Sequence, residues 1–167
     1  MRVSLLLTLP FALASAKHVT NLSETAWKLS NDLLNISVPA SLPSQAHLDL
    51  FAAGVIGDPY RDLNDFNLRW VVWQNWTYSS ALQGLSKNAS STWLQFNGLD
   101  TFADISLCGS RVASTNNQFR QWWFDVSEIV RGCEEEELVL ELEFGSAPIS
   151  ANGIAEEPGA ETWPYGV

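Results

Sequence analysis

The clearest hydrophobic pattern in the chain is the alternation at residues 138–144, where leucine and phenylalanine take every second position and Glu141 and Glu143 fall between them. A period of two residues predicts a strand with one buried and one solvent-facing side. Other short runs rich in aromatic and β-branched residues predict further strands over residues 27–30, 36–38, 68–78, 93–96, 102–107, 111–113 and 119–125. We therefore expect seven or eight short strands.

The strand predicted for residues 68–78 is the longest of these. Alternation places one set of side chains on one face, namely Trp70, Val72, Trp76 and Tyr78, and the other set on the opposite face, namely Val71, Trp73, Asn75 and Thr77. If Asn75 is glycosylated, the first set faces the core. Trp73 then lies near the surface or under a neighbouring domain.

Helical signals are few and short. Residues 41–53 suit one helix, which Ser44 can cap and Gly54 can end. The sequence from Asp125 to Glu128 has the capping-box pattern and opens one or two turns that stop at Gly132. Crossover helices for a parallel sheet are missing from this pattern. The fold class we expect is all-β, an antiparallel β-sandwich of jelly-roll, galactose-binding-domain-like type with one or two short helices.

The 167 residues suit a single globular domain. A (β/α)₈ barrel needs about 250 residues, so no such barrel fits in this chain. Residues 1–16 combine Arg2, an apolar run and a small-residue end at Ala14-Ser15-Ala16, the pattern of a secretory signal peptide. The apolar run is shorter than the roughly 20 residues that cross a bilayer. We expect a β-sandwich over residues 17–148 and a connector over residues 149–167.

The formal net charge is −10, which disfavours nucleic acid as a partner. The acidic excess is concentrated in residues 125–167, which hold eleven acidic residues and a single basic one, Arg131. Four consecutive glutamates at residues 134–137 indicate a solvated loop just before a strand.

Four Asn-x-Ser/Thr sequons occur, at Asn21, Asn35, Asn75 and Asn88. None has proline in the middle position, so each is a possible N-glycosylation site. Together with the predicted signal peptide they indicate a secreted, extracellular glycoprotein.

The only two cysteines are Cys108 and Cys133. In an oxidising compartment they can form one disulfide, closing a loop worth roughly 3 kcal/mol, and the alternative is two separate buried thiols. They do not suggest a metal site, because the only histidines, His18 and His47, are far away in sequence.

The sequence contains no convincing catalytic residue. Paired carboxylates would suit glycoside hydrolysis, yet no convincing pair stands out. Asp58, Asp62 and Asp65 lie near Arg69, where a Ca²⁺ site is conceivable but a turn with Asx hydrogen bonds and an ion pair to Arg69 fits better. No motif for a cofactor appears.

Trp122 and Trp123 are the candidate substrate-binding residues. They are adjacent, so on a strand they face opposite sides and one points away from the core. That side chain is either a platform for a sugar or a contact with another domain.

Several irregular stretches resemble the N-terminal domain of secreted fungal β-mannosidases of glycoside hydrolase family two. The resemblance runs from about residue 22 to residue 167. It rests on PSQAHLDL (43–50), GVIGDPY (54–60), LNDFNLRW (63–70), NWTY (75–78), FNGLDTFADI (96–105), NQFRQ (117–121) and FGSAP (144–148). The Cys108/Cys133 pair and residues 75–78 are the features typical of the fungal enzymes.

The resemblance implies a function for the whole enzyme rather than for this chain. Enzymes of that family release terminal non-reducing β-D-mannose with retention, using two glutamates on a barrel downstream of this domain. Neither glutamate matches a position here, so we expect a non-catalytic module that is inactive alone and stops at Val167, before the barrel. The implied partners are a β-mannoside or mannan-derived oligosaccharide and the barrel itself, with no nucleic acid, membrane, metal or cofactor. The alternatives are a free-standing lectin-like module and a fragment without function.

Overall fold

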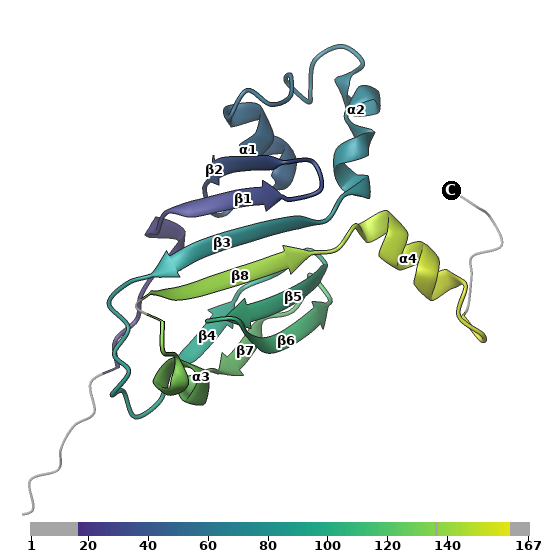
Figure 1. The fold of residues 1–167 in the computed structure, drawn as a ribbon. Coiled ribbons are helices and arrows are strands. Elements are labelled where there is room, and N and C mark those ends of the chain that lie inside the picture. The colour runs from purple at the N-terminus through teal and green to yellow at the C-terminus, as the bar shows by residue number, and fades with distance from the viewer. Residues whose placement is uncertain (1–16, 136, 161–167) are drawn as a thin grey trace, which may run out of the picture.

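A six-stranded antiparallel sheet forms the main layer of the protein (Figure 1). The computed structural model describes residues 17–135 and 137–160, so the predicted signal peptide lies outside the described residues. Along the sheet the strands are ordered β2 (Ile36–Ala40), β1 (Trp27–Asn31), β3 (Trp76–Leu82), β8 (Leu138–Phe144), β5 (Phe102–Leu107) and β6 (Ser110–Asn116).

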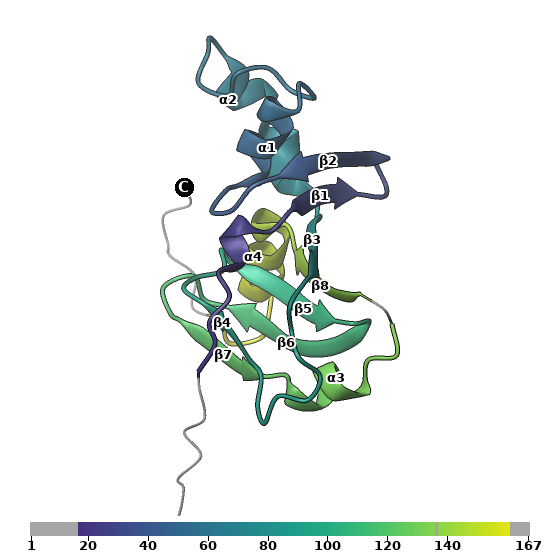
Figure 2. The same cartoon turned by 90° about the vertical axis from the view of Figure 1, so that its left-hand side faces the viewer.

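A second layer is the two-stranded antiparallel pair of β4 (Trp93–Phe96) and β7 (Trp122–Asp125). Figures 1 and 2 show this pair at the β5–β6 half of the molecule, away from β1 and β2. The two layers share one buried cluster, which includes Leu94 of β4, Leu107 of β5 and Leu140 of β8. The mostly antiparallel sheets and short helices confirm the predicted all-β fold class.

The helices number four in the described residues, rather than the one or two we expected, and two short 3₁₀-helices accompany them. They are η1 (Leu22–Glu24), α1 (Ala46–Ala52), α2 (Asn64–Asn67), η2 (Arg69–Trp73), α3 (Ser127–Gly132) and α4 (Ala147–Ala155). None of the described helices is both long and apolar enough to span a membrane.

The alternation predicted for residues 138–144 is confirmed in β8. Leu138, Leu140 and Leu142 are buried, while Glu141 and Glu143 are exposed. In β3 the burial also alternates, with Trp76 and Tyr78 inside as predicted. The pleat of a strand sends successive side chains to opposite faces, so each of these two central strands turns every second side chain into the core.

The prediction of a single strand over residues 68–78 is wrong. Residues 69–73 form η2, and β3 begins only at Trp76. The indole nitrogen of Trp76 donates to the carbonyl of Val71 at 2.9 Å, which fixes the turn, and Val71 is buried while Val72 and Trp73 are exposed. Tertiary burial of Val71 therefore overrides the β-propensity of this aromatic segment, and the predicted faces of Val71 and Val72 are exchanged.

The predicted C-terminal ends of the helices are confirmed, while the predicted N-caps are wrong. Gly54 takes a φ of +72° directly after the cap of α1, and α3 ends at Gly132, both as predicted. Gln45, not Ser44, is the N-cap of α1, and Val126, not Asp125, is the N-cap of α3. The Asp125 carboxylate instead accepts the backbone N–H of Ser127 at 2.9 Å.

Helix α1 is held to the sheet by a buried carboxylate. Asp49, only 4% exposed, accepts the hydroxyl of Tyr78 at 2.7 Å and the backbone N–H of Ser41 at 3.2 Å. The buried side chains of Leu50, the next residue, and of Ile56, after the helix, join the core cluster. The lobe made of α1, α2 and η2 at the upper end of Figure 1 is thus anchored on β3.

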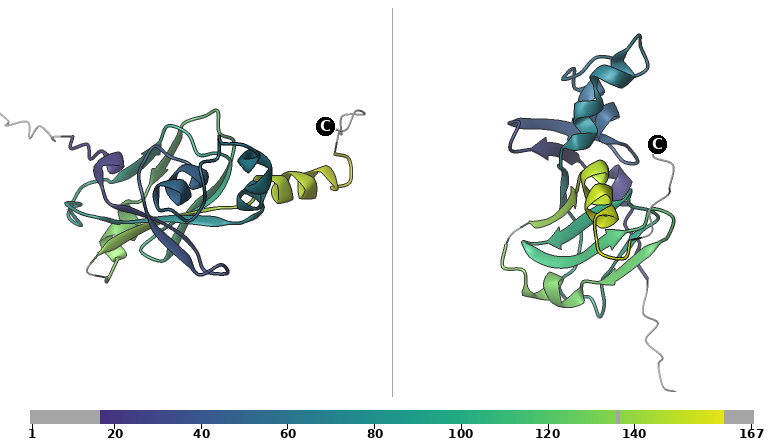
Figure 3. Two further views of the ribbon diagram at one scale, coloured as in Figure 1. Left: turned by 90° about the horizontal axis from the view of Figure 1, so that it is seen from above. Right: turned by 90° about the vertical axis from the view of Figure 1, so that its right-hand side faces the viewer.

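Helix α4 begins beside η2. Ser146 caps the helix, its N–H donates to Oδ1 of Asn75 at 2.9 Å, and its hydroxyl donates to the carbonyl of Val72 at 2.7 Å. Figure 3 shows α4 extending past the sheet on the side opposite to the first described residues. The predicted connector at residues 149–167 therefore starts within a helix, and residues 161–167 lie outside the described residues.

Candidate functional site

The two adjacent tryptophans of β7 face opposite sides, as predicted. Trp122 is half-buried: its ring stacks on Phe124 with centroids 6.2 Å apart and planes at 14°, and the guanidinium of Arg120 lies 4.3 Å from its centroid. Its indole nitrogen donates to the carbonyl of Asn117. Trp122 is therefore occupied by packing, and Trp123 is the one that points outward, with 51% of its surface exposed.

Trp123 has an exposed aromatic neighbour on β4. In the register of the pair, Trp123 lies opposite Gln95 and Asp125 lies opposite Trp93. Trp93 and Trp123 are consequently diagonal neighbours on one face, within reach of large side chains. Trp93 is 55% exposed. We call these four residues the outer β4–β7 face.

The rim of the outer β4–β7 face carries one oriented charge. Hydrogen bonds from the hydroxyl and backbone N–H of Ser127 hold the pKa of the Asp125 carboxyl below its usual value. Asp125 thus stays an anionic acceptor beside the exposed tryptophans. The opposite directions of Trp93 and Leu94 follow from their adjacency on a strand, but the pairing with Trp123 depends on strand register, which the sequence does not give.

One group of carboxylates on the sheet does not suit acid catalysis. A depression of about 420 Å³ on the sheet is lined by Asp104, Glu141, Glu143 and Arg111, and Arg111 lies 3.6 Å from Asp104. All three acids are exposed, whereas a general acid of a glycosidase is kept protonated by burial. Among the described residues, no group of three or more His, Cys, Asp and Glu side chains is arranged to hold a metal ion.

One part of the prediction for the turn at residues 58–67 is confirmed, and the other part is wrong. Oδ1 of Asp58 accepts the N–H of Tyr60 at 2.9 Å, an Asx turn. The ion pair to Arg69 is wrong: the guanidinium of Arg69 lies 4.4 Å from the ring centroid of Phe66, and Arg61 pairs with Asp62 instead. The short helix α2 turns Phe66 toward Arg69, which sequence spacing alone does not reveal.

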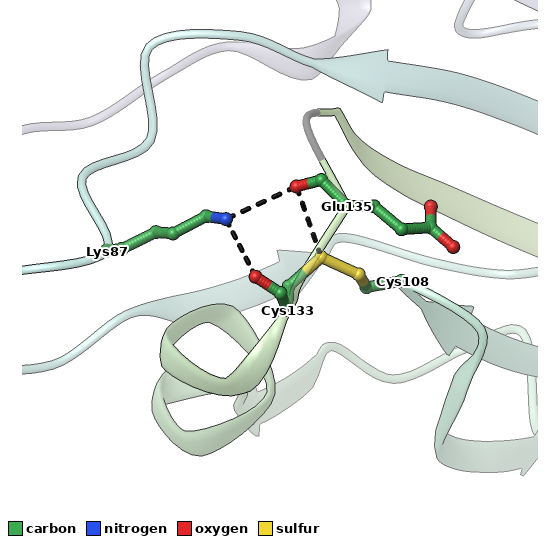
Figure 4. Close-up of a disulfide and its surroundings, with 4 residues drawn as sticks. All are labelled: Lys87, Cys108, Cys133 and Glu135. Carbon is green, nitrogen blue, oxygen red and sulfur yellow. Dashed lines mark hydrogen bonds between the residues drawn. A yellow bond between two sulfur atoms is a disulfide. The ribbon is translucent and has the colours of Figure 1, made fainter.

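A disulfide joins Cys108, in the turn after β5, to Cys133, just after α3, with Cα atoms 6.0 Å apart (Figure 4). The ammonium of Lys87 donates to the carbonyls of Cys133 at 2.7 Å and Glu135 at 3.2 Å. Glu134 and Glu135 are exposed and line, with both cysteines, a depression of about 520 Å³. These contacts tie three loops together at the end of the sheet near α3.

All four sequon asparagines are exposed: Asn21, Asn35, Asn75 and Asn88. Asn75 has its Oδ1 facing the N–H of Ser146, so this donor fixes the orientation of the amide and turns Nδ2 away from it. N-linked glycans attach at this nitrogen, so the hydrogen bond is compatible with a glycan.

The profile of the family described as "Glycosyl hydrolase 2 galactose-binding domain-like" matches residues 20–167. This chain belongs to that family. Within the family, the chain is 55% identical to beta-mannosidase A of Aspergillus terreus and 52% identical to that of Aspergillus aculeatus, over 90% and 91% of its length. It covers only 16% of each relative.

Solved structures agree with this assignment. A β-D-mannosidase from Dictyoglomus thermophilum matches 80% of the chain with a TM-score of 0.71 and 29% identity, and the match covers 16% of that enzyme. A β-D-glucuronidase from the same organism matches 74% of the chain with a TM-score of 0.51 and 16% identity, which shows a shared fold and nothing more. The galactose-binding domain-like fold of this chain thus corresponds to a small part of much longer glycoside hydrolases.

Proposed function

We propose that the chain is the N-terminal, non-catalytic module of a secreted β-mannosidase, which hydrolyses terminal non-reducing β-D-mannose residues in β-D-mannosides. The observation that supports this most strongly is the 55% identity to a beta-mannosidase A over 90% of the chain, combined with coverage of only 16% of that relative. The catalytic carboxylates then belong to the rest of the enzyme, and the β-mannoside or mannan-derived oligosaccharide binds there.

The experiment compares the chain alone with a chimera. The secreted 167-residue chain should give no turnover of an aryl β-mannoside above an empty-vector control. A chimera in which residues 20–160 replace the matching segment of the Aspergillus terreus enzyme should be secreted and active, because the module then has its natural context. Turnover by the chain alone, or an inactive chimera whose parent enzyme is active, would contradict the proposal.

Secretion is proposed from the leader pattern at residues 1–16 and the four exposed sequons. A glycosylated chain should appear in the medium of a fungal host and lose mass on treatment with an endoglycosidase. Asn88, which lies in a polar exposed stretch, is the acceptor we expect to be occupied, so Asn88→Gln should lower the mass by one glycan. Retention of the chain inside the cell would refute secretion.

A second candidate function, a lectin-like module, is favoured by the two exposed tryptophans of the outer β4–β7 face. Binding of mannobiose there should change tryptophan fluorescence in a saturable way, since the indoles lose contact with water. The change should vanish in Trp123→Ala but persist in Trp73→Ala, which removes an exposed tryptophan from η2. A flat titration of the unmodified chain would exclude this candidate.

A further inference from the structure

Exposed apolar side chains gather in one part of the molecule. Residues 48–73 contain eight of the sixteen large hydrophobic side chains that are exposed in the described residues. Three of the eight are the most exposed, Tyr60 at 83%, Leu63 at 71% and Phe66 at 62%. We call the eight the lobe surface: Leu48, Phe51, Val55, Tyr60, Leu63, Phe66, Val72 and Trp73.

The lobe surface lies on an ordered support. Leu50, Ile56 and Val71 alternate with the exposed residues and are buried in the core cluster. Asp49 binds Tyr78 of β3, and Asn64 donates to the carbonyl of Asp58 at 2.8 Å, which closes the loop before α2. The apolar side chains are therefore presented outward by a fixed backbone.

The exposed apolar area of these eight residues is comparable in total to one side of a protein–protein interface. With about 200 Å² for each large side chain, the eight exposed fractions correspond to on the order of 800 Å². One partner of a stable protein–protein interface contributes about this area. The outer β4–β7 face, with two exposed tryptophans, offers much less.

The start of α4 lies next to the lobe surface. Ser146 bonds to Val72 and Asn75, so α4 starts at the edge of η2, and Figure 3 shows α4 below α2 on the same side of the protein. Helix α4 also exposes Ile149 and Ile154. In the beta-mannosidase A relatives, most of the enzyme lies outside the matched segment, because the match covers only 16% of their length.

We propose that the lobe surface is the docking face for the rest of the parent β-mannosidase, the part that is joined through α4. The inference rests on the function proposed above, and it adds the surface and the residues that make the contact. Polar substitutions of Tyr60, Leu63 and Phe66 should cost little folding stability in the chain alone, where these side chains are mostly in water. The same substitutions should weaken the contact much more where the side chains are buried against a partner.

The test uses the chimera with the Aspergillus terreus enzyme in three versions. One is unmodified, one has Tyr60→Ser, Leu63→Gln and Phe66→Gln, and the matched control has Leu33→Gln and Phe119→Gln, two exposed apolar residues outside the lobe surface. The lobe variant should lose at least about tenfold of its secreted activity and should unfold in two separate thermal transitions. The control should behave as the unmodified chimera does. In the isolated chain, the lobe variant should keep the melting temperature of the unmodified chain.

Four outcomes would overturn the inference. An unchanged lobe variant of the chimera means that the surface is not buried there. An equal loss in the control means that the effect is not specific to the lobe surface. Equal destabilisation of the isolated chain shows that the three residues stabilise the module itself. A concentration-dependent dimer of the isolated chain that the lobe variant abolishes, with an unaffected chimera, assigns the surface to a second copy. If the unmodified chimera is itself inactive, the proposed function fails first.

Discussion

Replacing Asp49 by alanine should lower the free energy of unfolding of the chain by about 3 kcal/mol. The carboxylate is 4% exposed and accepts two hydrogen bonds, from the Tyr78 hydroxyl and the Ser41 N–H. Without it the hydroxyl of Tyr78, itself on a residue only 6% exposed, has no acceptor, and a buried unpaired donor costs about 1–3 kcal/mol. Helix α1 also loses its polar anchor on β3. Urea unfolding measures the change.

A double-mutant cycle separates the hydrogen bond from the packing. Tyr78→Phe removes the hydroxyl alone, and the two substitutions together should cost clearly less than the sum of the two single costs, because each removes the same bond. Asp65→Ala, which removes an exposed acid from α2, is the control and should change stability by less than about 0.5 kcal/mol. Strict additivity, or a cost for Asp49→Ala as small as that of the control, would show that the buried bond contributes little.

The same pair predicts a dependence on alkaline pH. Burial above all, and then the hydrogen bond to Asp49 and its charge, raise the pKa of Tyr78 far above the ordinary value for tyrosine. The folded chain keeps the proton, while the unfolded chain releases it above pH of about 10. The contribution of the protonated Tyr78 hydroxyl to the free energy of unfolding is therefore fully present below pH of about 10 and declines as the pH rises further. The decline between pH 9 and 11 should be shallower in Tyr78→Phe than in the unmodified chain.

The strands that the sequence predicts well are those whose burial is decided by the sheet alone. In β8 the leucines face the core and the glutamates face water, so a period of two residues is visible without any knowledge of neighbours. Residues 68–78 defeat the same reasoning. Val71 is drawn into the core by the turn that Trp76 closes, and this contact between side chain and carbonyl leaves no trace in hydrophobic periodicity.

The candidate surfaces were predictable only at the level of single side chains. The opposite directions of Trp122 and Trp123 follow from adjacency on a strand. The juxtaposition of Trp123 with Trp93 requires the pairing of β4 with β7, two strands about thirty residues apart, and register between distant strands is set by the whole core.

The lobe surface is harder still to foresee. Its apolar residues resemble core residues in composition, and only the fold shows that Leu50 and Val71 are inside while Phe51 and Val72 face outward. Short helices give too few turns to define an apolar stripe, so the exposed side must come from the structure.

Replacing both cysteines by serine should lower the free energy of unfolding by about 3 kcal/mol, because the disulfide between Cys108 and Cys133 restricts a loop of 25 residues in the unfolded chain. The bridge also positions the end of α3. The carbonyls of Cys133 and Glu135, just after this helix, accept hydrogen bonds from the Lys87 ammonium. The measurement is urea unfolding of the double variant and of the unmodified chain, with thiol titration of the denatured protein expected to find no free cysteine in the latter.

Reduction supplies the matched control for this prediction. In the presence of a thiol reductant the unmodified chain should unfold at the same urea concentration as the double variant, whose own midpoint should not respond to the reductant. Lys87→Met should cost only about 1 kcal/mol, since it removes hydrogen bonds to partly exposed carbonyls and leaves the loop closed. Equal midpoints for the oxidised chain and the double variant would mean that the loop between β5 and α3 is held by packing around Leu107 and Val130 rather than by the bridge.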